Sequence, residues 1–96
     1  MIEDWNDPEY CLLKVRENPL NLEFVINQTP EICLEAVKRN GYAIEYVKEQ
    51  TPLIIHYLKK YHISLYEAFK TKNRITITDN EMIEFYNENP HLLLTL

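Results

Sequence analysis

Basic and aromatic side chains alternate over residues 59–74, which gives this segment the clearest means of binding another molecule. Its cations are Lys59, Lys60, Lys70, Lys72 and Arg74, and the rings between them are Tyr61, His62, Tyr66 and Phe69. Nucleic-acid sites combine phosphate-contacting cations with stacking rings in this way. However, the whole chain has a formal charge of −5 and no known nucleic-acid motif, which weakens that interpretation.

Two pairs of tyrosines have the spacing of neighbours on one helix face. Tyr42 and Tyr46 are four residues apart, as are Tyr57 and Tyr61. Tyrosine is enriched at protein-binding hot spots because it offers a large, rigid surface with a polar tip. The alternative is that these rings fill gaps between short helices. Together with the basic segment, the pattern predicts a partner-binding site formed by Tyr57, Lys60, Tyr61, Tyr66, Lys70 and Arg74.

Residue types that support catalysis or metal binding are few and badly spaced. His56, His62 and His91 lack the spacing that places ligands on one helix face, so we expect isolated histidines, exposed or half-buried, and no metal. The one serine, Ser64, has no nucleophile elbow, and a single glycine cannot form a phosphate-binding loop. The sequence therefore predicts a protein that is not an enzyme and has no cofactor.

The elements that must position these residues repeat along the chain. Residues 7–28 and 29–50 align at a period of 22, and a third, degenerate copy covers residues 51–72. Identical residues include Pro8 and Pro30, Cys11 and Cys33, Val15 and Val37, Asn18 and Asn40, and Gln28 and Gln50. A fixed period indicates one small structural unit stacked on copies of itself. With a connector and C-terminal cap over residues 73–96, residues 1–96 form a single domain.

Each copy begins with a helix-start signal. Asp7-Pro8, Thr29-Pro30 and Thr51-Pro52 each place a capping oxygen before a proline, which fits the first helical position because its missing N–H would be unpaired there. Apolar residues then recur at helical spacing. The pattern predicts a short amphipathic helix in each copy.

A corner follows the first helix of each copy. Asn40-Gly41 predicts a helix end with Gly41 in the left-handed conformation, and Asn18-Pro19 fills the same position in the first copy. A second short helix then covers residues 20–26 or 42–48. Each unit is thus a pair of helices of roughly two to three turns that are stable only when stacked.

The C-terminal half departs from this pattern. Residues 51–72 form either one bent helix or two helices broken near His62-Ile63. Residues 75–78 alternate like a strand but have no evident partner strand. Thr78 and Glu81 have the spacing of a capping box, which predicts a helix over residues 79–88. The tail HLLLTL either packs on this cap or forms a contact between two copies of the chain.

The two cysteines and the N-terminus indicate the compartment. Cys11 and Cys33 fall at equivalent positions of neighbouring helices, which lie about 8–10 Å apart, whereas a disulfide needs Cα atoms within about 7 Å. We therefore expect buried thiols in a reducing environment. The N-terminus lacks the apolar run of a signal peptide, and no apolar stretch could cross a membrane. A cytoplasmic protein is predicted, in the host-cell interior if the protein is viral.

The second copy carries a specific resemblance. The core from Leu34 to Gly41, LEAVKRNG, is followed by Ala43-Ile44-Glu45-Tyr46. This string resembles the tandem repeats of the domain of unknown function 4116 family over residues 29–50, and more weakly over residues 7–28. The resemblance implies helical repeats of large viruses and bacteria, with no assigned chemistry and no catalytic residue.

These observations predict an all-α fold of short stacked helical hairpins with a divergent C-terminal cap. Formal charge is uneven, at −6 over residues 1–37, +5 over residues 38–74 and −4 over residues 75–96. We expect a non-catalytic protein-binding module, such as a small phage- or virus-encoded inhibitor of a host or defence protein. The alternatives are nucleic-acid binding through residues 59–74 and an acidic mimic of nucleic acid. No membrane partner is expected.

Overall fold

The computed structural model describes residues 3–95, and within that range its regular structure is entirely helical. In chain order the elements are α1 (Pro8–Glu17), the 3₁₀-helix η1 (Pro19–Phe24), α2 (Pro30–Arg39), the 3₁₀-helix η2 (Gly41–Tyr46), α3 (Pro52–Tyr61), α4 (Ile63–Thr71), α5 (Asp79–Glu88) and the 3₁₀-helix η3 (Pro90–Thr95). The predicted all-α class is confirmed.

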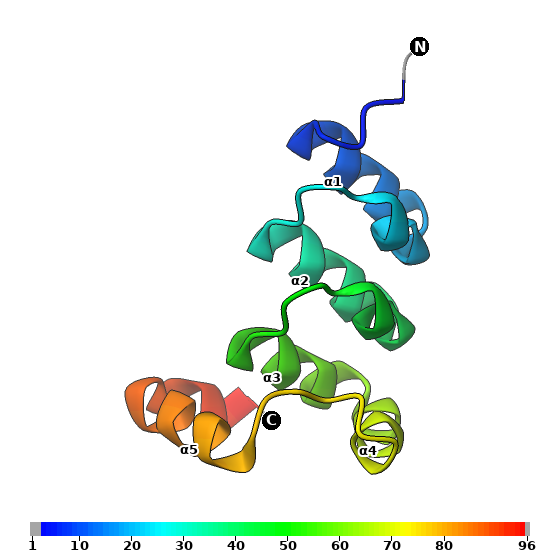
Figure 1. The fold of residues 1–96 in the computed structure, drawn as a ribbon. Coiled ribbons are helices and arrows are strands. Elements are labelled where there is room, and N and C mark those ends of the chain that lie inside the picture. The colour runs from blue at the N-terminus through cyan, green and yellow to red at the C-terminus, as the bar shows by residue number, and fades with distance from the viewer. Residues whose placement is uncertain (1–2, 96) are drawn as a thin grey trace.

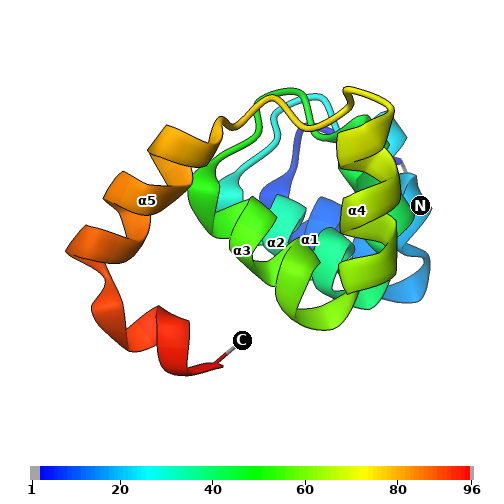
Figure 2. The same ribbon diagram turned by 90° about the horizontal axis from the view of Figure 1, so that it is seen from below.

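Helices α1, α2 and α3 lie side by side in the same orientation, and η1, η2 and α4 lie together along one side of them (Figure 1). The first residues of α1, α2 and α3 are separated by one sequence period each, and so are those of η1, η2 and α4. The connecting segments run back across the stack from the second helix of each pair to the next α-helix (Figure 2). The molecule is elongated, with extents of 45 × 27 × 19 Å.

The predicted helix starts are confirmed by their capping hydrogen bonds. Asp7 Oδ1 accepts from the Glu9 backbone N–H at 3.1 Å, and Thr29 Oγ1 accepts from the Ile32 N–H at 3.3 Å. Thr51 caps α3 in the same way. Each proline after the cap occupies the first turn, where no N–H is needed.

The two corner asparagines have nearly the same backbone conformation. Asn18 has φ −148° and ψ 108°, and Asn40 has φ −149° and ψ 111°. In both cases the side-chain oxygen accepts a backbone N–H two residues later, so the asparagine begins the second helix as well as ending the first. That second helix is a six-residue 3₁₀-helix of about two turns, at the lower end of the predicted range, and it begins one residue before the predicted start.

The predicted left-handed conformation of Gly41 is wrong, because its φ is not positive. The glycine is needed for close packing instead. A Cβ at this position would lie 2.8 Å from Leu65 Cδ1 and 3.0 Å from His62 Cβ. The side chains of His62 and Leu65 therefore pack so closely on Gly41 that a Cβ there would force one of them to shift.

Residues 51–72 form two helices, so the second of the two alternatives is correct. Helix α3 ends at Tyr61 and α4 begins at Ile63, with His62 between them. Residues 75–78 do not form a strand. They are held by Gln50, whose amide N–H donates to the Arg74 carbonyl at 2.8 Å and whose oxygen accepts from the Thr76 N–H at 2.8 Å.

Gln28, the equivalent residue of the first copy, makes the same type of bridge. Its amide N–H donates to the Tyr46 carbonyl at 2.7 Å, and its oxygen accepts from the Lys48 N–H at 2.9 Å. Each glutamine thus supplies hydrogen bonds to an irregular connecting segment that has no regular backbone partners. The two residues join each unit to the connector that follows the next one.

Both cysteines are buried free thiols, as predicted. The Cys11 thiol donates to the Trp5 carbonyl at 3.2 Å, and the Cys33 thiol donates to Gln28 Oε1 at 3.5 Å. Burial raises the pKa of Cys33 to about 11, so this thiol stays protonated near neutral pH. The two cysteines belong to the hydrophobic core that runs through the stack.

The predicted capping box at Thr78 and Glu81 is present and begins α5. Helices α4 and α5 lie on opposite sides of α3 (Figures 1 and 2). His56 of α3 is 0% exposed, and its Nδ1 lies 2.9 Å from the Tyr86 hydroxyl of α5. The expectation of an exposed or half-buried histidine is therefore wrong for His56. Contact with Tyr86 of α5 contributes to this burial. The sequence predicted that this helix caps the stack, but not that it covers His56.

Candidate partner-binding face

Four side chains of α2 and α3 form an exposed cluster, the lysine–tyrosine face, defined by Lys38, Tyr57, Lys60 and Tyr61. The rings of Tyr57 and Tyr61 stack with centroids 6.1 Å apart and planes inclined by only 10°. Their spacing of four residues places them on the same side of α3, as predicted. Tyr61 is 52% exposed and Tyr57 is half-buried. Of the two stacked rings, Tyr61 is therefore the one more open to solvent.

Two lysines lie over these rings. Lys38 Nζ is 4.3 Å from the centroid of the Tyr57 ring, and Lys60 Nζ is 5.4 Å from that of Tyr61. Both distances are within the range of a cation–π contact. A ring attracts a cation but leaves its charge in place. Neither lysine forms an ion pair within residues 3–95, so the face is positively charged.

The equivalent contact between α1 and α2 has a different chemistry. Arg16 and Glu35 occupy the positions one sequence period before Lys38 and Tyr57, and Arg16 Nε lies 3.6 Å from Glu35 Oε1. The same carboxylate accepts a hydrogen bond from Arg39 at 2.6 Å, which lowers the pKa of Glu35 below its ordinary value. Between α1 and α2 the cation is thus paired with an anion, whereas between α2 and α3 it is not.

The six predicted site residues do not form one cluster. The structure brings Tyr57, Lys60 and Tyr61 together, but the other three lie on α4 and the connector after it. Tyr66 is only 8% exposed, with Lys70 Nζ 5.8 Å from its ring centroid. Lys70 is also paired with Asp79 at 2.7 Å. Arg74 is exposed and contacts Gln50 through its backbone carbonyl.

Lys38 belongs to the lysine–tyrosine face but was absent from the sequence prediction. It lies outside the basic segment 59–74, whose composition guided that prediction. The signal that could have found it is the period itself, because Lys38 occupies the position equivalent to Lys60 on a neighbouring helix. Residues at equivalent positions of stacked units fall on the same surface.

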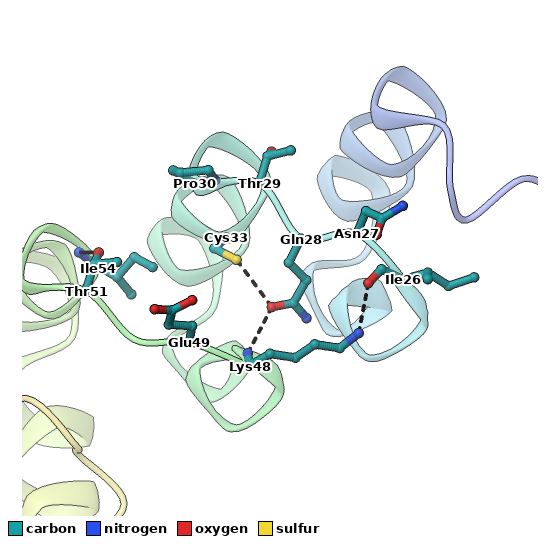
Figure 3. A pocket seen from close by; sticks show the side chains of 10 residues that line it. All are labelled: Ile26, Asn27, Gln28, Thr29, Pro30, Cys33, Lys48, Glu49, Thr51 and Ile54. Atoms are coloured by element: carbon teal, nitrogen blue, oxygen red, sulfur yellow. Dashed lines mark hydrogen bonds between the residues drawn. The ribbon is translucent and has the colours of Figure 1, made fainter.

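A groove of about 410 Å³ lies between two connecting segments and the starts of α2 and α3 (Figure 3). Its polar groups are largely bonded to one another. Lys48 Nζ donates to the Ile26 carbonyl at 2.9 Å, and the Lys48 backbone N–H donates to Gln28. The Cys33 thiol at this groove is protonated near neutral pH, so it is a poor nucleophile. These contacts give the groove a role in holding neighbouring units together.

Within residues 3–95, no three or more His, Cys, Asp or Glu side chains gather as a metal site would need. Over the same range no helix has the length and apolar character to cross a bilayer.

Comparison with known protein families gives a match over the N-terminal half of the chain. The family described as Domain of unknown function (DUF4116) matches residues 7–51. The resemblance read from the sequence is confirmed for this segment. No curated protein and no solved structure matches the chain. The matched segment covers α1 to η2 and includes Lys38, but it ends before Tyr57, Lys60 and Tyr61. Most of the lysine–tyrosine face therefore lies outside the segment that matches DUF4116.

Proposed function

We propose that the chain is a non-catalytic protein-binding module and that its lysine–tyrosine face binds an acidic segment of a partner protein. The observation that carries this proposal is the arrangement of Lys38 and Lys60 over the stacked rings of Tyr57 and Tyr61 without a paired carboxylate. Aromatic rings with adjacent cations are typical of binding hot spots. A partner carboxylate would supply the counter-charge that this face lacks.

The charge distribution favours a protein partner over a nucleic acid. The segments that flank the basic middle of the chain carry −6 and −4, so they would repel an extended phosphate backbone that runs beyond the lysine–tyrosine face, whereas a short acidic segment of a protein need not reach them. The tyrosine rings stack on each other, and Tyr57 is half-buried, so they offer little free area to incoming bases. Lys70, a cation of the basic segment, is already paired with Asp79.

A random peptide display library tests this proposal even though the partner is unidentified. The library would be selected on the wild-type protein and counter-selected on the Lys38→Gln, Lys60→Gln double variant. Both lysines are exposed, so the variant keeps the core intact. We expect the surviving peptides to be rich in Asp and Glu. Peptides that bind the double variant equally well, or that show no acidic enrichment, would refute the proposal.

The nucleic-acid alternative is tested by fluorescence anisotropy with a labelled random single-stranded RNA. We expect no binding at low salt. Binding that falls steeply as salt is raised would favour the alternative, because each neutralised phosphate releases counter-ions. The inhibitory role and the viral or phage origin stay predictions from the sequence.

A further inference from the structure

Three aromatic side chains line a small pocket at the N-terminal end of the stack, far along the chain from the lysine–tyrosine face. The Trp5 ring lies between the rings of Tyr10 and Phe24, with centroid distances of 5.3 Å and 5.4 Å. The Tyr10 ring stands at 78° to Trp5 and the Phe24 ring at 43°, so the three rings form walls in different directions. The pocket has a volume of about 320 Å³ and is also lined by Glu3, Lys14, Glu17 and Asn21.

Hydrogen bonds to the backbone of Trp5 fix the position of this residue. The Trp5 carbonyl accepts hydrogen bonds from the Ile26 N–H at 3.1 Å and from the Cys11 thiol at 3.2 Å. Cys11 is buried in the core and Ile26 directly follows the buried Val25. The pocket is therefore built on the packed part of the molecule.

The pocket already accommodates a cation. Lys14 Nζ lies 5.6 Å from the centroid of the Tyr10 ring and 3.2 Å from Glu17 Oε2. Glu17, Tyr10 and Glu3 all raise the pKa of Lys14, with the Glu17 hydrogen bond as the largest cause. Glu3 itself forms no ion pair within residues 3–95. The surrounding segment, residues 1–37, carries a formal charge of −6.

We propose that this aromatic pocket binds an alkylated ammonium group. The faces of the rings are electron-rich and attract cations, and groups of rings around a quaternary ammonium are a known mode of recognition. A bare ammonium needs several hydrogen-bond acceptors to replace its water. Here Glu17 is paired with Lys14, and the Asn21 amide donates to the Lys14 carbonyl at 3.0 Å. An alkylated cation, which needs fewer hydrogen bonds, suits the rings and the remaining Glu3 carboxylate better.

The pocket contains its own reporter, because Trp5 is the only tryptophan of the chain. Choline would be titrated while Trp5 fluorescence is recorded, with 3,3-dimethyl-1-butanol as the neutral isostere and sodium chloride at matched ionic strength as the control. We expect a saturable change with choline and none with either control. An equal response to the neutral isostere would overturn the proposal, because it would show simple apolar binding.

Two variants with opposite expected effects make the test specific. Phe24→Ala removes a half-exposed wall and should weaken choline binding by about two- to fivefold, the value of one exposed cation–π contact. Lys14→Gln removes the competing cation and should strengthen it. Tyr61→Ala, on α3, should leave it unchanged. Affinities that do not move in these directions would overturn the proposal.

An alkylated ammonium group comes either from a free small molecule or from a modified lysine of a partner protein. A peptide that contains trimethyllysine distinguishes the two sources. Tighter binding of this peptide than of choline assigns the pocket to a modified partner protein. The reverse order assigns it to a free small molecule. A failure of both to bind contradicts the proposal, and leaves the function proposed for the lysine–tyrosine face unaffected.

Discussion

Two contacts at equivalent positions of the stack differ in their electrostatics. Arg16 reaches from α1 to Glu35 of α2, and at the equivalent positions of the next pair Lys38 reaches from α2 to Tyr57 of α3. In the first contact the cation meets a carboxylate, which also binds Arg39. In the second it meets the face of a ring, so its charge persists at the surface. With a ring in place of the carboxylate, Lys38 lacks the counter-charge that Glu35 gives to Arg16 and Arg39.

The buried positions of α1 and α2, by contrast, are alike. Val15 and Val37 are both 0% exposed, and Cys11 and Cys33 are both buried. Packing therefore constrains the inner positions of α1 and α2 in the same way, while the outer positions are free to differ. The inner positions thus serve stability, and the outer positions can differ without a loss of packing. We therefore assign binding to the outer side of α2 and α3.

Residues 7–28 and residues 29–50 should differ most in their sensitivity to substitution at the corner positions Pro19 and Gly41. Gly41→Ala should lower the free energy of unfolding by about 1–3 kcal/mol, because the added Cβ overlaps His62 and Leu65. Pro19 already has a side chain at the equivalent position, so Pro19→Ala should have a smaller effect. Urea denaturation measures both. Equal losses in the two variants would contradict the packing role of Gly41.

The glutamine bridges should respond locally to substitution. Gln50→Ala removes three hydrogen bonds to residues 74–76 and should cost about 1–2 kcal/mol. Gln28→Ala should have a similar cost through the Lys48 N–H and the Tyr46 carbonyl. Hydrogen exchange would show faster exchange at Thr76 in the first variant and at Lys48 in the second. If exchange becomes faster at the same amides in both variants, the two glutamines do not act as separate bridges.

His56 distinguishes α3 from its neighbours, because Leu12 and Leu34 occupy the equivalent positions. Burial, followed by the charges of Lys60 and Lys59, lowers the pKa of His56 below its ordinary value near 6.5. The unfolded chain therefore binds more protons in the interval below that value, and stability should fall as the pH falls through it.

Thermal unfolding between pH 7.5 and pH 5 measures this pH effect. His56→Leu should flatten the profile, whereas a matched change at the exposed His91 should leave it unchanged. A wild-type profile that rises toward low pH would have the wrong sign for a buried neutral histidine.

Local signals in the sequence were sufficient for part of the fold. The capping residues before each proline gave the starts of α1, α2 and α3, and the pair Thr78 and Glu81 gave the start of α5. These signals work because a cap and its partner lie within a few residues of each other. The buried cysteines followed from the apolar stripes in the same way.

Features that depend on contacts between distant segments were missed. The role of Gly41 depends on α4, and the burial of His56 depends on Tyr86, 30 residues further along the chain. The sequence prediction likewise placed Tyr66 and Lys70 with Tyr61, because it followed the basic segment instead of the surface made by neighbouring helices. Lys38 joins the face only once α2 and α3 are stacked.

The affinity of an acidic peptide selected on the wild-type protein, measured by calorimetry for matched variants, tests the central claim most directly. Lys38→Gln and Arg16→Gln remove one positive charge each at equivalent positions of neighbouring helices. We expect Lys38→Gln to weaken binding by about two- to fivefold, the value of one exposed ion pair, and Arg16→Gln to leave it unchanged. Equal losses in the two variants, or a greater loss for Arg16→Gln, would contradict the account.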